Sequence, residues 1–145
     1  MGAMYSFKNR SAELKQIFES VPSGQETYRK IMEIGKNLSP LENDKKCESN
    51  RVQGCQSITY LASEFENGSV EFRADSDALI SKGIIALLIH LYSGLTPEEI
   101  LKNPPQILQE MGILSSISIT RANGLASMYL KMKQEALKFY QAHSL

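Results

Sequence analysis

One cysteine in a glycine-containing loop is the residue of this chain best placed for covalent chemistry. Cys55 belongs to the stretch NRVQGCQS, residues 50–57, directly before the strongest hairpin signal in the sequence. Gly54 allows backbone angles that a Cβ disfavours, so the chain can turn sharply and leave the thiol near a loop tip. The other polar members of the loop are Arg51, Gln53, Gln56 and Ser57. Because the thiolate is the nucleophile, this polar setting indicates a reactive cysteine, and the alternative is a small buried hydrophobic side chain.

Three further side chains could ligate metals or react with thiols, and each has a simpler structural interpretation. Cys47 is predicted to be a surface thiol, with an oxidative disulfide to Cys55 as the alternative. His90 is expected to be a buried core histidine with its hydrogen bonds satisfied, and His143 lies at an end expected to fray. Their spacing matches no short metal motif, so we expect no metal site.

The elements that must position Cys55 begin with two amphipathic helices. The first is expected over residues 11–21 with Ser11 as its N-cap. The second follows a capping box at residues 23–26 and is expected to end at Pro40. Residues 39–50 are charged and aperiodic, which predicts an exposed loop.

A β-hairpin is predicted directly after the cysteine loop. Asn67 and Gly68 form a type I′ turn signal because that turn needs positive φ at both central residues. One register gives the hairpin a mostly apolar face. It pairs Glu66 with Ser69, Phe65 with Val70, Glu64 with Glu71, Ser63 with Phe72, Ala62 with Arg73, and Leu61 with Ala74. Ile58 and Tyr60 indicate that the far end is covered on both faces. A third short strand around Arg51 and Val52 would place Cys55 at the end of the sheet.

Helices are predicted for the rest of the chain. Residues 78–92 are apolar nearly all round, which is typical of a core helix, and residues 75–77 are expected to cap it. Residues 96–99, with the sequence TPEE, open a short helix, and another short helix ends at Gly112. The last helix is expected over residues 120–142, with an apolar stripe of Leu125, Met128, Tyr129, Met132, Ala136 and Phe139. The fold class is therefore α+β, a small antiparallel sheet covered by helices.

Length and composition indicate one ordinary globular domain. The chain has 145 residues, 42% of them hydrophobic and 22% charged, and we place the domain at residues 4–145 with Met1-Gly2-Ala3 as a cloning remnant. Sixteen basic residues balance sixteen acidic ones, which argues against nucleic acid or an anionic membrane as partner. With no signal-peptide pattern and no long apolar run, a cytoplasmic protein is expected.

Four segments, taken together, resemble the SufE family of sulfur-acceptor proteins from the Suf iron–sulfur cluster assembly pathway. They are NRVQGCQS at 50–57, DSDA at 75–78 running into Lys82-Gly83, the stretch 92–97, and TRANGL at 120–125. These segments follow the order and spacing of the family.

The resemblance implies a fold shared with the IscU-type scaffold proteins and a defined reaction. A pyridoxal-phosphate-dependent cysteine desulfurase of SufS type would hold sulfur as a persulfide, and Cys55 would accept it. The chain would then stimulate the desulfurase and deliver sulfur to a scaffold of SufBCD type. It would act as a covalent carrier without a cofactor of its own, as a monomer or weak homodimer.

The resemblance also assigns supporting positions. Arg121 matches the basic residue near the cysteine loop, where it could stabilise thiolate or persulfide charge, and first-turn solvation of a helix is its alternative role. Asp75 matches the helix opening beside the loop, with helix capping as the favoured explanation. Two other functions stay open: an iron–sulfur scaffold of the related fold, and a thiol redox protein that uses Cys55 and Cys47.

Overall fold

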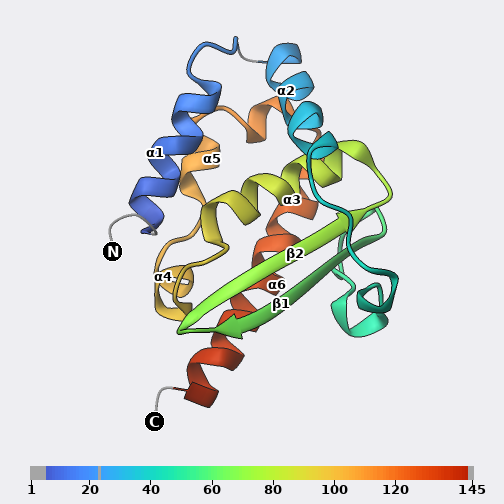
Figure 1. Cartoon of the computed structure of the whole chain (residues 1–145). Coiled ribbons are helices and arrows are strands. Elements are labelled where there is room, and N and C mark those ends of the chain that lie inside the picture. Colours follow the sequence, from blue (N-terminus) through green and yellow to red (C-terminus); the bar gives the residue numbers. More distant parts are fainter. Residues whose placement is uncertain (1–5, 23, 144–145) are drawn as a thin grey trace.

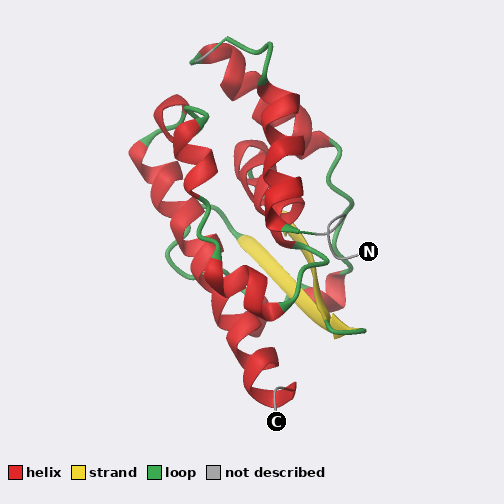
Figure 2. Cartoon of the chain, turned by 90° about the vertical axis from the view of Figure 1, so that its left-hand side faces the viewer, coloured by secondary structure: helices red, strands yellow, loops and turns green. Residues whose placement is uncertain are grey.

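A two-stranded antiparallel hairpin lies against a layer of helices (Figures 1 and 2). The computed structural model describes residues 6–22 and 24–143. Its helices and strands are α1 (Phe7–Phe18), α2 (Gln25–Lys36), β1 (Thr59–Glu66), β2 (Ser69–Ser76), α3 (Leu79–Tyr92), α4 (Pro97–Lys102), α5 (Gln106–Glu110) and α6 (Ile119–His143). Short 3-10 turns occur at Asn43–Lys45, Glu48–Asn50 and Leu114–Ser116. The predicted α+β class is confirmed.

The hairpin has the predicted register along its whole length. Asn67 and Gly68 adopt φ values of 52° and 84°, as a type I′ turn requires. Glu66 pairs with Ser69 next to the turn, and Thr59 pairs with Ser76 at the far end. One prediction about this end is wrong, because Ile58 is 44% exposed rather than covered.

The third strand is reduced to a single bridge. Arg51 pairs with Tyr60, and the Val52 N–H donates to the Thr59 carbonyl at 2.8 Å. The 3-10 turn Glu48–Asn50 precedes this contact and the turn at Gly54 follows it, so the chain has no room to extend the ladder. The bridge nevertheless anchors the cysteine loop to the start of β1.

Helix α3 forms the centre of the core and contacts α2 unusually closely. A Cβ added at Gly83 would lie 2.1 Å from the Ile31 carbonyl oxygen, and one at Gly35 would lie 2.7 Å from the Gly83 nitrogen. The two helices therefore touch backbone to backbone, with α2 packed beside α3 (Figure 1).

The starts and ends of the first two helices differ from the predictions. Helix α1 begins at Phe7, because Ser6 rather than Ser11 is the N-cap and accepts the Asn9 N–H at 3.2 Å. In α2 the N-cap position is Gly24, without a side-chain cap, and Ser23 of the predicted capping box lies outside the described residues. Helix α2 ends at Lys36, where the next residue, Asn37, donates its side-chain amide to the Glu33 carbonyl.

The predicted cap of α3 is wrong. Strand β2 continues to Ser76, so Asp75 and Ser76 are paired with β1 and neither is the N-cap residue of α3. Ala78 is the N-cap residue and makes no side-chain cap bond, while the Asp77 carboxylate accepts the Ile58 N–H at 3.0 Å. The acidic stretch therefore joins β2 to the cysteine loop rather than opening α3.

The later helices agree with prediction. Thr96 caps α4 by accepting the Glu99 N–H at 3.2 Å. Helix α6 buries Leu125, Met128, Met132 and Ala136 of the predicted stripe. Its last residue, His143, is stacked on Phe65 with ring centroids 4.3 Å apart, which the expectation of a fraying end missed. No helix within the described residues is long and apolar enough to cross a membrane.

Candidate functional site

The thiol of Cys55 is half-buried against helix α6. Gly54 adopts φ 81° as predicted, and this turn directs the chain back toward the helix. A Cβ added at Gly124 would lie 3.3 Å from the Cys55 Sγ, so the sulfur occupies the space that this glycine leaves. Ser127, one helical turn on, donates to the Gly54 carbonyl at 3.3 Å. The cysteine loop therefore packs against helix α6.

A pair of buried hydroxyl groups reaches the sulfur from the hairpin. The Thr59 Oγ1 lies 3.6 Å from the Cys55 Sγ and 2.9 Å from the Ser76 Oγ. Thr59 and Ser76 are cross-strand partners at the last pair of the hairpin, and Thr59 is fully buried. The far end of the sheet is therefore a wall of the cysteine site.

Arg121 binds a second hydroxyl cluster, which includes Ser57 of the loop. Its Nη1 donates to the Ser57 Oγ at 2.5 Å and to the Ser81 Oγ at 3.0 Å, and the two serine oxygens are 2.8 Å apart. Ser57 lies two residues after Cys55, and Ser81 belongs to α3. Arg121 thus turns inward from the first turn of α6, instead of being solvated there.

Buried polar side chains are concentrated around this thiol. Within the described residues the buried polar or charged side chains are Thr27, Ser57, Thr59, Asp75, Ser76 and Ser81. All but Thr27 lie beside the cysteine loop or one residue from a group that does. Because an interior polar group costs free energy unless it is hydrogen-bonded, such a concentration is typical of a functional site.

Asp75 holds a neighbouring segment and does not touch the sulfur. It accepts the Leu41 N–H at 3.3 Å and the Ser76 N–H at 2.9 Å, and it pairs with Lys46 at 3.3 Å and Lys82 at 3.5 Å. Burial alone raises the pKa of Asp75, but these hydrogen bonds and the two ammonium groups outweigh it, so the pKa is lowered. Asp75 therefore fastens the loop before Cys55 to the end of β2.

Sequence reasoning named some residues that the structure keeps away from the thiol and missed others that contact it. Gln53 and Gln56 are exposed, and the Gln53 side chain donates to Glu48 at 3.4 Å. The missed residues at the sulfur are Thr59 and Gly124, and Ser81 and Ser127 were missed as partners of Ser57 and Gly54 in the loop. Only Thr59 had a usable signal, since strand alternation turns it toward the same face as Leu61.

Cys47 is an exposed free thiol, as predicted. Its Sγ lies 3.3 Å from the Ser49 Oγ, and this hydrogen bond lowers the pKa of Cys47. The Ser49 carbonyl accepts from Lys131, whereas Cys55 lies against Gly124. The two thiol segments thus contact α6 about two helical turns apart, which disfavours a direct disulfide in this conformation.

His90 differs from the satisfied core histidine that was predicted. It is half-buried, and its Nε2 is 3.2 Å from a Glu13 carboxylate oxygen, in a geometry that makes no hydrogen bond. Burial lowers the pKa of His90 and outweighs the opposite effect of the Glu13 charge. His90 belongs to the contact between α3 and α1 and is remote from the cysteine loop.

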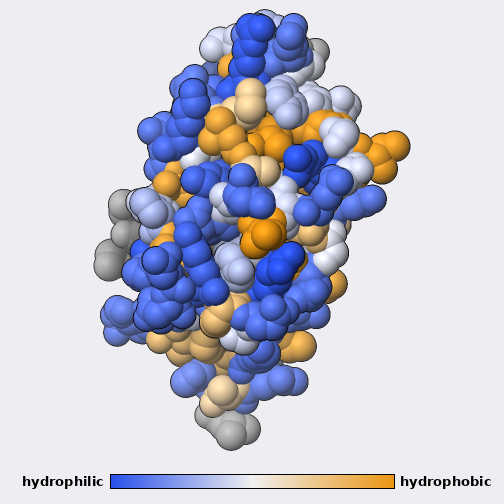
Figure 3. All heavy atoms as spheres, turned by 90° about the vertical axis from the view of Figure 1, so that its right-hand side faces the viewer, coloured by the Kyte–Doolittle hydropathy of each residue, from blue (hydrophilic) through white to orange (hydrophobic). Residues whose placement is uncertain are grey.

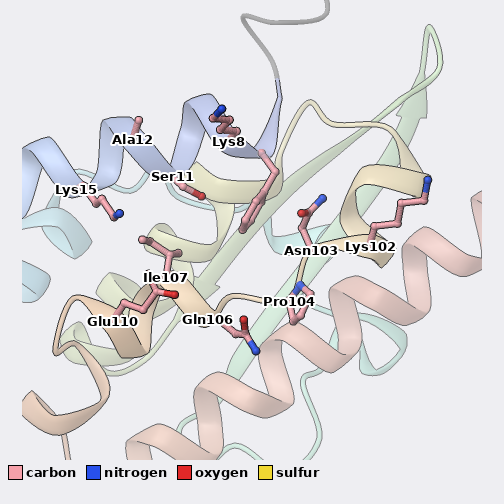
Figure 4. A pocket seen from close by; sticks show the side chains of 11 residues that line it. Lys8, Ser11, Ala12, Lys15, Lys102, Asn103, Pro104, Gln106, Ile107 and Glu110 are labelled. Atoms are coloured by element: carbon pink, nitrogen blue, oxygen red, sulfur yellow. The ribbon is translucent and has the colours of Figure 1, made fainter.

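A cavity of about 540 Å³ lies between α1 and the α4–α5 segment (Figure 4). Lys8 and Lys15 line it from α1, and Ile107 and Glu110 line it from α5. It occupies the side of the molecule opposite the segment that joins α2 to β1 (Figure 1). No cysteine lines this cavity, and no group of three or more metal-binding side chains is close enough to hold a metal within the described residues.

Comparison with known proteins identifies the family of this chain. The family model described as "SufE: Fe-S metabolism associated domain" matches residues 12–136, and the chain belongs to this family. It is 34% identical over 133 residues to an uncharacterized SufE-like protein of Synechocystis, covering 92% of this chain and 84% of that protein. It is 37% identical over 126 residues to SufE-like protein 1, chloroplastic/mitochondrial, of Arabidopsis thaliana, covering 86% of this chain and 34% of that protein.

Two further matches concern a named relative and the fold. The cysteine desulfuration protein SufE of Plasmodium falciparum is 29% identical over 135 residues, with 89% of this chain and 54% of that protein covered. The solution structure of a hypothetical protein from Thermus thermophilus superposes with a TM-score of 0.73 at 23% identity, covering 89% of this chain and 94% of that one. Family membership points to sulfur transfer in iron–sulfur metabolism, and the solved structure supports the fold.

Proposed function

We propose that this protein is a persulfide carrier in which Cys55 accepts sulfur from a cysteine desulfurase. The observation that carries the proposal is the half-buried Cys55 thiol, which lies against the buried Thr59 hydroxyl in a chain of the SufE family. Arg121 is bonded to Ser57, two residues after Cys55. The chain would stimulate the desulfurase by removing its product and would deliver sulfur for cluster assembly.

The transfer step is a thiol–persulfide exchange. The Cys55 thiolate attacks the terminal sulfur of the desulfurase persulfide, and a new sulfur–sulfur bond forms on Cys55. The bond inside the donor persulfide breaks, and its electron pair leaves on the donor thiolate. No oxidant or reductant is needed. Because a persulfide is more easily oxidised than a thiol, the recess against Gly124 would shelter it between transfers.

Partners and location follow from the same proposal. The sulfur donor would be a pyridoxal-phosphate enzyme of SufS type and the acceptor a scaffold of SufBCD type, while this chain would hold no cofactor. We propose a cytoplasmic carrier that is a monomer or weak homodimer and does not itself turn over free cysteine.

The two rival functions have less support. A cluster scaffold needs three or four well-placed ligands, and the described residues contain no such group. A redox protein would use Cys47 to resolve Cys55, but their segments contact α6 about two turns apart.

Intact-mass spectrometry tests the carrier role. The protein is incubated without oxygen with a cysteine desulfurase and cysteine, alongside the Cys55→Ser and Cys47→Ser variants. We expect a sulfur adduct of about 32 Da that is lost only in Cys55→Ser. The absence of an adduct on wild-type protein, with a desulfurase shown to be active, would contradict the proposed function.

A further inference from the structure

Thr59 is the hydroxyl group in direct contact with the sulfur, and the charge state of the sulfur decides where its proton points. The Ala78 N–H lies 3.4 Å from the Ser76 Oγ, and a backbone N–H can only donate. The Ser76 oxygen therefore accepts from Ala78, and the Ser76 hydroxyl also bonds the Thr59 hydroxyl at 2.9 Å, where either group can be the donor.

The charge on Cys55 decides which group donates in each of these hydrogen bonds. A thiolate can only accept hydrogen bonds, so the Thr59 hydroxyl, 3.6 Å away, must donate to it. Its oxygen is then free to accept from Ser76. The resulting chain runs from the Ala78 N–H through Ser76 and Thr59 to the sulfur, with every proton oriented toward the negative charge.

We propose that Thr59 is a catalytic residue that stabilises the Cys55 thiolate by donating a hydrogen bond, and that Ser76 is a positioning residue that orients it. The inference rests on the proposed carrier function for its biological meaning. Thr59 keeps its proton throughout, and the sulfur transfer follows the exchange already described. Because Thr59 is fully buried, water cannot replace its hydroxyl without opening the end of the hairpin.

Charged groups reach this neighbourhood from three elements and two connections, and the proposed variants leave all of them in place. They are Arg121 on α6, Lys82 on α3, Asp75 on β2, Asp77 in the β2–α3 connection, and Lys46 in the connection before the cysteine loop. An effect of Thr59 on the thiol can therefore be separated from the effect of charge.

The test is the rate of Cys55 alkylation by iodoacetamide as a function of pH. All variants carry Cys47→Ser, so that Cys55 is the only thiol. Thr59→Val keeps the shape and removes the hydroxyl. We expect the pH at half-maximal rate to rise by about one unit. A more basic thiolate is also more nucleophilic, so the plateau rate at high pH rises by about threefold and the rate at pH 7 falls by about threefold.

Three comparisons make the result specific. Thr59→Ser restores the hydroxyl and should return the profile to that of the parent, and Ser76→Ala should shift it in the same direction by a smaller amount. Thr27→Val removes another buried threonine hydroxyl, which bonds the Pro22 carbonyl in a distant part of the fold. This variant should leave the pH profile of Cys55 alkylation unchanged.

An unchanged midpoint in Thr59→Val, or a failed rescue by Thr59→Ser, would overturn the assignment. A change in plateau rate alone would also contradict it, since altered loop exposure changes access but not the midpoint. If Thr59→Val does not fold, an unchanged midpoint in Ser76→Ala overturns the proposal equally. The assay contains no desulfurase, so its outcome is independent of whether the carrier function is correct.

Discussion

At the scale of single residues, Gly124 determines how closely the Cys55 sulfur can approach helix α6. The methyl group introduced by Gly124→Ala would lie 3.3 Å from the sulfur, closer than a relaxed contact, so the thiol must move outward. We expect faster alkylation of Cys55 by iodoacetamide on a Cys47→Ser background. Stability should change little, because replacing a mid-helix glycine by alanine gains about 1 kcal/mol that offsets the crowding. An alkylation rate equal to that of the parent would show that the recess does not limit access.

At the scale of elements, a methyl group added at the contact between α2 and α3 should strongly destabilise the fold, unlike the one added at Gly124. In Gly83→Ala the new methyl group meets the Ile31 carbonyl, which belongs to backbone and cannot turn away. We expect a loss of about 3 kcal/mol in the free energy of unfolding, measured with urea. Gly124→Ala is the matched control, since it adds the same methyl group inside a helix but against a side chain, Cys55, rather than against backbone. Equal stabilities of the two variants would contradict the close helix contact.

Asp75 joins three elements, and its contribution depends on pH. The folded-state pKa is lowered, so the stabilisation is complete above the unfolded value of about 3.9 and is lost as pH falls through the folded value. Asp75→Asn should lower the free energy of unfolding at pH 7 by about 1–2 kcal/mol. The difference between variant and wild type should begin to shrink below about pH 4, where Asp75 of the unfolded chain takes up a proton, and should be lost once the folded-state carboxylate is protonated as well. A difference that stays constant down to pH 2 would show that the charge is not what fastens the loop.

At the scale of the whole molecule, three exposed apolar side chains lie close in sequence to the residues of the Arg121 cluster, and we call them the apolar rim. Ile58 follows Ser57, Leu79 precedes Ser81 by two residues, and Ile119 precedes Arg121 by two, and all three are exposed. Figure 3 shows apolar side chains gathered in the upper part of one face, among hydrophilic ones. Under the carrier proposal a sulfur donor must contact this rim, because the two sulfur atoms have to meet.

Ile119→Asp should therefore weaken sulfur transfer from the desulfurase. Ile119 is 82% exposed, so the substitution leaves folding intact, and we expect a loss of about tenfold in transfer at limiting concentrations. Leu130→Asp is the matched control, since Leu130 is 53% exposed on the same helix about 16 Å along the axis. Alkylation of Cys55 should be unchanged in both variants. Equal rates of sulfur transfer by Ile119→Asp and Leu130→Asp would show that the rim is not part of the interface with the desulfurase.

The local elements of this protein were determined by short-range sequence signals. Asn67-Gly68 set the hairpin and its whole register, because a one-residue slip would turn the apolar side chains to the wrong face. Gly54 predicted the turn before Cys55, and its φ of 81° confirms it. The Thr96 cap was likewise predictable, since capping depends on four consecutive residues.

The surroundings of the thiol were decided only by tertiary structure. Thr59 and Gly124 meet Cys55 from a strand and a helix, and Ser81 of another helix bonds Ser57 of the loop. Strand alternation indicates which way Thr59 faces, but the local sequence of these residues does not indicate that they come together at the loop. Asp75 was predicted to cap a helix because the neighbouring residues are typical of a helix start. Strand β2 instead continues through Asp75 to Ser76, which pairs with Thr59. Local patterns specify backbone shape through the bonds within a few residues, whereas a polar cluster depends on which distant segments the buried core brings together.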